Sequence, residues 1–277
     1  MSFLCVTIAG RLTDRLIEPI DQMAADIEHA THLNPYQELA PFVRTIQSQH
    51  EEIVKGAEMR QEFTANVSHE LKTPLTSISG YAELIGAGFA DEKEIIHFAG
   101  EIKNNAQRLL TLINDIIRLS ELDGRHAETS FEMVNLCEIA KKVIGLLDFQ
   151  ARKNRIKLQI LGENTYIHAN RNMMEELIYN LCDNAIRYNK VGGSVTVIIT
   201  ESQGQVLLTV KDTGIGIPVE SRERIFERFY RVDKSRSRET GGTGLGLAIV
   251  KHIAEIHNAQ IVVEGDLGKG TRITIHF

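Results

Sequence analysis

The sequence of 277 residues contains no tryptophan and only three cysteines. Cys5, Cys137 and Cys182 are far apart and form no Cys-x-x-Cys pair, so neither a disulfide framework nor a zinc-thiolate site is expected. The net charge is -6 at pH 7, which gives no indication of a nucleic-acid partner. With 43% hydrophobic and 25% charged residues, the composition is that of a globular chain of about two domains.

A long hydrophobic run is lacking at the N-terminus. The apolar residues 3–9 are far fewer than the roughly 20 that a membrane-spanning helix needs. Arg11 and Arg15 follow them, as is typical where a membrane helix ends on the cytoplasmic side. One interpretation is the end of an upstream transmembrane segment that is missing from this chain, which would place the chain on the cytoplasmic side of the cell membrane. The other is a short N-terminal helix.

Apolar residues recur every three or four positions in the N-terminal half, which predicts long amphipathic helices. Three such patterns cover residues 12–27, 39–85 and 95–122. A break at Asn34-Pro35 separates the first two, and a turn at 86–88 joins the last two into a helical hairpin. A hairpin covers only part of its apolar surface, so two hairpins are expected to pack as a four-helix bundle in a homodimer.

Beyond about residue 125, β-branched runs alternate with helical patterns. Strands are expected at 195–200, 206–210, 261–264 and 272–277, and helices at 136–149, 172–188 and 245–257. The pattern predicts an α/β sandwich with helices on one face of a mixed sheet, and therefore an α+β chain overall. The expected domains are a helical linker at 1–57, the hairpin at 58–125 and the α/β domain at 126–277.

His69 lies outside the apolar stripe of its helix, so core packing does not explain it. Glu70 follows directly, and Thr73 is one turn further on the same helix face. Pro74 is expected to interrupt the helical hydrogen bonds. A zinc-protease helix is excluded, because the second histidine of His-Glu-x-x-His would have to stand at position 73. A nucleophile, a carboxylate and a hydroxyl are thus grouped together.

Polar groups of one predicted helix point to cation and phosphate binding. Asn180, Asn184 and Arg187 are spaced by four and three, which places them on one helix face. Amide oxygens are good ligands for a hard cation, and arginine suits phosphate oxygens. Taken alone, this pattern is also that of an ordinary polar helix face.

Two glycine-rich segments follow further along the chain. Asp212 begins Asp-Thr-Gly-Ile-Gly-Ile-Pro, in which Gly214 and Gly216 permit close backbone approach. Residues 241–247, Gly-Gly-Thr-Gly-Leu-Gly-Leu, open a predicted helix whose exposed amides could meet a phosphate. Neither the dinucleotide-binding fingerprint nor the P-loop fits these glycines.

Together, and in this order, these segments resemble the N, G1 and G2 boxes of the Bergerat (GHKL) ATP-binding fold. Residues 225–231, Ile-Phe-Glu-Arg-Phe-Tyr-Arg, resemble its F box, and the stretch around His69 resembles the phosphoacceptor box of sensor histidine kinases. The resemblance covers residues 58–277 and is to the HisKA-type sensor histidine kinases of two-component systems. It implies that the protein autophosphorylates His69 from Mg-ATP and passes the phosphoryl group to an aspartate on a separate response regulator.

The resemblance also implies individual roles. Asn184 would coordinate Mg²⁺ with Asn180 nearby, Arg187 would contact phosphate where many members have lysine, and Asp212 would recognise adenine. Further nucleotide contacts are expected from Tyr188, Gly214, Gly216, Lys234, Arg236, Gly242, Thr243, Gly244, Leu245 and Gly246. The cations between residues 228 and 238 would belong to a mobile lid over ATP. Glu70 would hold the productive tautomer of His69, and Thr73 would position water for a phosphatase activity toward the regulator.

Two other classes of function stay open. The same ATP-binding fold serves type II topoisomerases, mismatch-repair proteins and heat-shock chaperones, which hydrolyse ATP to drive conformational change; those proteins lack the His69 helix. The other class is a degenerate kinase that dimerises and binds nucleotide without phosphoryl transfer.

Overall fold

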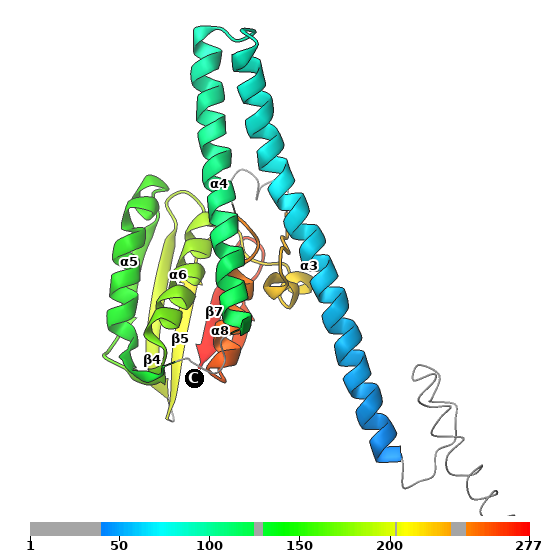
Figure 1. Ribbon diagram of the computed structural model, residues 1–277. Coiled ribbons are helices and arrows are strands. Elements are labelled where there is room, and N and C mark those ends of the chain that lie inside the picture. Colours follow the sequence, from blue (N-terminus) through cyan, green and yellow to red (C-terminus); the bar gives the residue numbers. More distant parts are fainter. Residues whose placement is uncertain (1–39, 125–129, 203, 234–241) are drawn as a thin grey trace, which may run out of the picture. The chain divides into compact units, whose positions relative to one another are not determined.

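The computed structural model describes residues 40–124, 130–202, 204–233 and 242–277 (Figure 1). The chain divides into two compact units, one that ends at Ser68 and one that runs from His69 to Phe277. The helix expected at 12–27, the apolar residues 3–9 and Cys5 lie outside the described residues.

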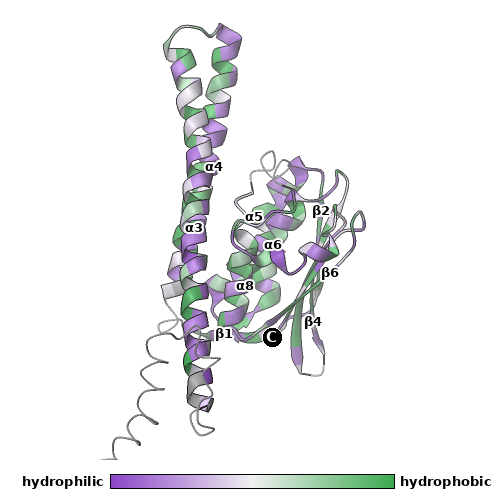
Figure 2. Ribbon diagram, turned by 90° about the vertical axis from the view of Figure 1, so that its right-hand side faces the viewer, coloured by the Kyte–Doolittle hydropathy of each residue, from purple (hydrophilic) through white to green (hydrophobic). Residues whose placement is uncertain are grey.

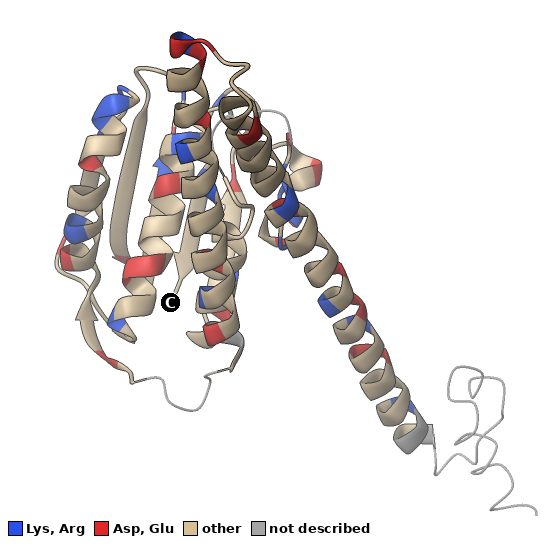
Figure 3. Cartoon of the chain, turned by 45° about the horizontal axis from the view of Figure 1, so that its top comes forward, with Lys and Arg blue, Asp and Glu red and all other residues tan. Residues whose placement is uncertain are grey.

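The segment around His69 belongs to one continuous helix, α3 (Ala40–Gly86). The described side chains between residues 41 and 68 are all at least partly exposed, and both signs of charge occur among them (Figure 3). The helix continues through Pro74, although proline cannot donate a hydrogen bond to the preceding turn. Pro74 therefore removes one hydrogen bond from the helix without ending it.

A short loop joins α3 to α4 (Glu92–Gly124), which confirms the predicted hairpin. A capping box begins α4: the Glu94 N–H donates to Asp91 Oδ1 at 2.8 Å, and the Asp91 N–H donates to Glu94 Oε2 at 2.9 Å. Several apolar side chains of the hairpin are exposed, namely Leu75, Leu84, Ile95, Leu110, Ile113 and Ile117. The hairpin alone thus leaves much of its apolar surface uncovered.

The C-terminal part contains a mixed sheet of five strands in the order β2-β4-β5-β7-β6. These strands are β2 (Lys157–Gly162), β4 (Ser194–Ser202), β5 (Gln205–Asp212), β6 (Gln260–Glu264) and β7 (Arg272–His276). β2 and β4 pair in parallel, with Leu158 opposite Val195, and the other neighbours are antiparallel. Two further strands, β1 (Glu132–Asn135) and β3 (Tyr166–Ala169), form a separate antiparallel pair.

Three helices cover one face of the larger sheet (Figures 1 and 2). They are α5 (Leu136–Lys153), α6 (Arg171–Arg187) and α8 (Gly246–Ile256). Asparagine caps begin two of them: Asn135 Oδ1 accepts from the Cys137 N–H at 3.0 Å, and Asn170 Oδ1 accepts from the Met173 N–H at 3.0 Å. The apolar faces of helices and sheet meet in a buried core that includes Leu136, Leu177, Ile178, Val197, Leu208, Val250 and Ile253.

This architecture confirms the predicted α/β sandwich with helices on one face of a mixed sheet. The predicted strands and helices occur with ends shifted by a few residues at most. β1, β2 and β3 were not predicted. Each is at most six residues long, and β1 and β3 pair with each other although α5 and β2 lie between them in the sequence.

Among the described residues between β5 and α8 there are two short 3-10 helices. They are η2 (Val219–Ser221) and η3 (Arg224–Phe226). Among the described residues, no helix is both long enough and apolar enough to cross a membrane.

Candidate active site

Helix α6 brings the predicted polar group to the edge of a cavity of about 450 Å³. Asn180, Asn184 and Arg187 all line this cavity, as the spacing along one helix face requires. The Arg187 Nε donates to Asp183 Oδ2 at 2.5 Å. Asp183 was not among the predicted site residues, although its position four residues before Arg187 is the usual spacing of a helical ion pair.

The Asn180 amide is oriented with its oxygen available to a ligand. Its Nδ2 donates to the Glu176 carbonyl at 3.0 Å, which leaves Oδ1 as the acceptor on the cavity side. A Cβ added at Gly246 would lie 2.8 Å from this Oδ1 and 3.7 Å from Asn184 Nδ2. Glycine at position 246 therefore lets α8 approach the two amides closely. The two side chains fit a hard cation that keeps several of its waters and takes few protein ligands.

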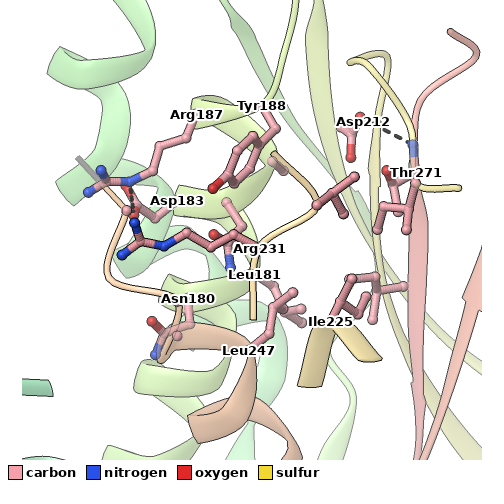
Figure 4. Close-up of a pocket in the computed structure, with 18 of the residues that line it drawn as sticks. Asn180, Leu181, Asp183, Arg187, Tyr188, Asp212, Ile225, Arg231, Leu247 and Thr271 are labelled. Atoms are coloured by element: carbon pink, nitrogen blue, oxygen red, sulfur yellow. Dashed lines mark hydrogen bonds and ion pairs between the residues drawn. The ribbon is translucent and has the colours of Figure 1, made fainter. Parts of the chain in front are cut away.

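Asp212 ends β5 and presents a carboxylate at the opposite side of the cavity (Figure 4). Its Oδ1 accepts from the backbone N–H of Gly214 at 2.7 Å and of Thr271 at 3.2 Å. Burial raises the pKa of Asp212, while these two backbone hydrogen bonds and a side-chain hydrogen bond with Thr271 oppose the rise. With Oδ1 committed to the backbone, Oδ2 is the oxygen left to accept from a bound base.

The glycine-rich segments close the cavity with bare backbone. Gly216 has a φ of +74°, and a Cβ there would meet the Asp266 carbonyl at 2.1 Å. Gly244 has a φ of +76°, and its added Cβ would meet Phe229 Cα at 2.9 Å. A side chain at either position would be strained and blocked.

The other predicted nucleotide contacts fall into three groups. Tyr188, Gly242 and Thr243 line the cavity, whereas Gly214 and Leu245 are beside residues that line it. Gly214 packs against the Tyr188 carbonyl, since a Cβ there would lie 2.3 Å from that oxygen. Lys234 and Arg236, with most of the expected lid, lie outside the described residues.

An arginine of the F-box segment forms part of the cavity wall. Only 6% of the Arg231 side chain is exposed. Its Nη2 donates to Glu70 Oε2 at 3.2 Å, and its Nε has no hydrogen-bond partner among the described residues. Figure 4 shows this side chain extending toward α6. From the sequence, Arg231 was expected only as one of the cations between residues 228 and 238, and it was not among the predicted site residues.

The hairpin contributes a second group of residues. His69 and Thr73 are exposed on α3, and the Thr73 hydroxyl donates to the His69 carbonyl at 3.2 Å. Glu70 Oε2 accepts from Arg108 at 3.3 Å in addition to Arg231. His69 does not line the cavity, whereas Thr111 and Asp115 of α4, which were not predicted, do.

The two described cysteines belong to the buried core. Cys137 and Cys182 are both buried and unbonded. Burial and the nearby Asp183 charge raise the pKa of Cys182 to about 12, so its thiol stays protonated. Within the described ranges, no group of three or more His, Cys, Asp or Glu side chains is placed to hold a metal ion.

Comparison with protein families agrees with both parts of this geometry. Residues 59–125 match the His Kinase A (phospho-acceptor) domain. Residues 169–277 match the histidine kinase-, DNA gyrase B-, and HSP90-like ATPase domain. Fold and cavity thus define a histidine-bearing hairpin joined to an ATP-binding domain. The chain belongs to the HisKA-type sensor histidine kinases, a family of ATP-dependent histidine kinases.

Individual relatives support the same assignment. The sensor histidine kinase WalK of Bacillus subtilis (strain 168) is 36% identical over 219 residues, which cover 78% of this chain and 36% of that protein. The chain thus spans about a third of the length of the curated relatives it matches. Full-length ShkA, solved in complex with AMPPNP, matches with a TM-score of 0.56 and 27% identity over 78% of this chain and 45% of that chain.

A second solved structure shows the shared fold over a longer stretch. Histidine kinase ThkA, solved in complex with the response regulator protein TrrA, matches with a TM-score of 0.65 and 24% identity. The match covers 88% of this chain and 67% of that chain.

Proposed function

We propose that this protein phosphorylates His69 with the γ-phosphate of ATP and then passes the phosphoryl group to an aspartate on a response regulator. The observation that carries the proposal is the presence, in one chain, of an exposed helical histidine and of a cavity lined by amides, arginines and glycine backbone. Phosphoryl transfer needs a nucleophile that can be brought to the γ-phosphate and groups that neutralise phosphate charge, and these two features are suited to those two tasks.

His69 is proposed as the nucleophile, because its imidazole is exposed and free of core packing. One ring nitrogen attacks the γ-phosphorus, the bond to the β–γ bridging oxygen breaks, and ADP leaves with the electron pair. Glu70 is proposed to accept a hydrogen bond from the other ring nitrogen and so to fix the tautomer. Since Arg108 and Arg231 both donate to Oε2 of Glu70, Oε1 is the oxygen proposed to accept this hydrogen bond.

The cavity residues are proposed to hold ATP as the sequence resemblance implies. Asp212 Oδ2 would accept from the adenine amino group, and Arg187 would contact phosphate oxygens. Asn184, with Asn180 beside it, would coordinate Mg²⁺, which neutralises charge on the phosphates when it is bound. The solved structure of full-length ShkA in complex with AMPPNP supports nucleotide binding in this fold.

Incubation with ATP labelled at the γ-phosphate tests the transfer step. Acid-labile, base-stable label is expected on the wild-type protein and is expected to vanish in His69→Gln. His97→Gln is the matched control, because His97 is also an exposed histidine of the hairpin, on α4. Release of free phosphate without labelled protein would instead favour a conformational ATPase. Neither product would favour a nucleotide-binding scaffold.

Thr73 is proposed to serve a phosphatase activity toward the regulator. It lies one turn from His69, exposed on the same helix, where its hydroxyl can position water against a phosphoaspartate. Thr73→Ala is expected to slow dephosphorylation of the phosphorylated regulator and to leave labelling of His69 unchanged. Equal loss of both activities would refute this separate role.

The hairpin is proposed to dimerise into a four-helix bundle. The support is its row of strongly exposed apolar side chains, among them Leu110 and Ile117, which a second hairpin would cover. Light scattering at micromolar concentration is expected to give twice the chain mass, and Ile117→Glu is expected to lower it. A monomeric wild-type mass would contradict the proposal.

The remaining proposals concern the setting of the chain. An upstream membrane segment would place it at the cytoplasmic side of the cell membrane, as proposed from the apolar residues 3–9 and the arginines after them. The domain boundaries also stay proposals: a helical linker at 1–57, the hairpin at 58–125 and the ATP-binding domain at 126–277.

A further inference from the structure

Helix α4 places a carboxylate inside the cavity that the proposed function assigns to ATP. The Thr243 hydroxyl donates to Asp115 Oδ2 at 2.6 Å. The same hydroxyl accepts from the backbone N–H of Leu245 at 3.3 Å. Leu245 directly precedes α8, so the Thr243 hydroxyl connects Asp115 by hydrogen bonds to the N-terminus of that helix. This is the end of a helix that stabilises a negative charge.

The Asp115 side chain is partly buried at the wall of the cavity. Its partner Thr243 is 8% exposed. Burial raises the pKa of Asp115, while the hydrogen bond from Thr243 and the charge of Arg187 lower it and the charge of Asp183 raises it. A second negative charge brought into this space would therefore be poorly screened.

An independent feature shows that the cavity suits an anion other than Asp115. The Arg231 guanidinium is almost completely buried in the cavity wall, and its Nε has no hydrogen-bond partner among the described residues. Glu70 engages only its Nη2. A buried donor without an acceptor is costly, and a phosphate oxygen is an acceptor of the right kind.

We infer that Asp115 sets the affinity for nucleotide by acting as an intramolecular anion that competes with the phosphate groups at the N-terminus of α8. The inference rests on the proposed binding of ATP in this cavity. A triphosphate that reaches the glycine-rich loop must displace Asp115 from Thr243 or bind against its charge. By linkage, bound nucleotide weakens the hold of α4 on the loop by the same factor.

The hairpin has another contact with the ATP-binding domain that lies outside the cavity. Arg118 Nε donates to Glu176 Oε2 at 2.6 Å, one turn beyond Asp115 on α4. Loss of this ion pair would loosen the same helix without removing an anion from the cavity. It therefore separates a general effect of helix contact from the specific effect of the Asp115 charge.

Titration calorimetry with AMPPNP and with adenosine tests the inference on the full chain. Asp115→Asn keeps the side-chain shape and removes the charge, so AMPPNP is expected to bind at least about fivefold more tightly, the lower end of ordinary coupling between sites. Adenosine carries no phosphate, so its affinity is expected to stay unchanged. Arg118→Gln and Glu101→Gln, both on α4, are the controls and are expected to leave the AMPPNP affinity within about twofold.

A double-mutant cycle tests whether the effect passes through the glycine-rich loop. In a Thr243→Val background the hydroxyl that joins the carboxylate to α8 is gone, so Asp115→Asn is expected to give a smaller gain in AMPPNP affinity. An equal gain in both backgrounds would overturn the role assigned to Thr243. Circular dichroism of each variant checks that the fold is retained.

The possible results separate the role of Asp115 from the proposed binding of ATP. Wild-type binding of AMPPNP that Asp115→Asn leaves unchanged or weakens would overturn the inference alone. Equal tightening of AMPPNP and adenosine, or tightening by Arg118→Gln as well, would show a general opening of the cavity and would also overturn it. Failure of the wild type and all variants to bind AMPPNP would overturn the proposed function, and the inference with it.

Discussion

Replacement of Asp212 by asparagine should weaken nucleotide binding without lowering the free energy of unfolding. Two backbone N–H groups, of Gly214 and Thr271, converge on Oδ1 of Asp212. In the asparagine variant the carbonyl oxygen must stay in this place, because the amide NH₂ would oppose two donors. The NH₂ therefore takes the position of Oδ2, and an acceptor for the adenine amino group becomes a donor.

The size of the effect follows from this exchange. A hydrogen bond to a charged group contributes about 1.5–3 kcal/mol, and the unpaired donors left behind add to the loss. We expect ATP analogues to bind more weakly by about 3 kcal/mol, roughly 100-fold. The free energy of unfolding should not fall, because burial raises the pKa of Asp212 and the variant removes a buried charge without losing either backbone bond.

Calorimetry with AMPPNP and with the matching guanosine analogue is the assay. Guanine carries an acceptor where adenine carries its amino group. Asp212→Asn should therefore lower the ratio of the affinity for AMPPNP to the affinity for the guanosine analogue. Asp148→Asn on α5 is the control, since Asp148 pairs with Arg152 on an exposed surface away from the cavity. An unchanged AMPPNP affinity, or an equal loss for both nucleotides, would refute the role given to Oδ2.

Three further predictions concern α8 and the hairpin. Gly246→Ala places a methyl group 2.8 Å from Asn180 Oδ1, so AMPPNP affinity should fall about tenfold with Mg²⁺ and much less without it, by calorimetry. Burial lowers the pKa of His257, whose Nε2 accepts from the Asn170 N–H at 3.1 Å. The free energy of unfolding of the wild type should therefore fall as the pH drops below about 6.5, by about 1.4 kcal/mol for each pH unit in which only the unfolded chain binds the proton. Urea titrations should show a smaller fall for His257→Gln. Asp91→Ala removes half of the capping box of α4 and should lower the free energy of unfolding by about 1 kcal/mol in the same assay.

Each of these predictions has a matched control. Gly204→Ala changes a glycine outside the cavity, so its effect on Mg²⁺-dependent binding should be nil. His168 is exposed, so His168→Gln should leave the acid-dependent loss of stability in place. Asp91→Asn keeps an acceptor at the cap and should recover most of the stability. A pH profile that is the same in wild type and His257→Gln would contradict the sign worked out for that group.

The hairpin could be predicted from the sequence because its information is local. Apolar spacing of three and four residues predicts a helix and its buried face from the local sequence, without knowledge of the tertiary structure. The turn at 86–88, which was predicted from its turn residues, is confirmed, and α4 includes all of the predicted residues 95–122. Short strands such as β1 were missed, because four residues acquire a strand conformation only from a partner that the local pattern does not show.

The sequence motifs alone predicted several of the residues that line the cavity. Asn180, Asn184 and Arg187 share a face because a helix repeats every 3.6 residues, and this is a property of spacing alone. The meeting of Asp115 with Thr243, 128 residues apart, and of Glu70 with Arg231, 161 residues apart, was decided only by the tertiary structure. Such contacts depend on how buried faces close over one another, and no local rule of propensity or periodicity carries that information.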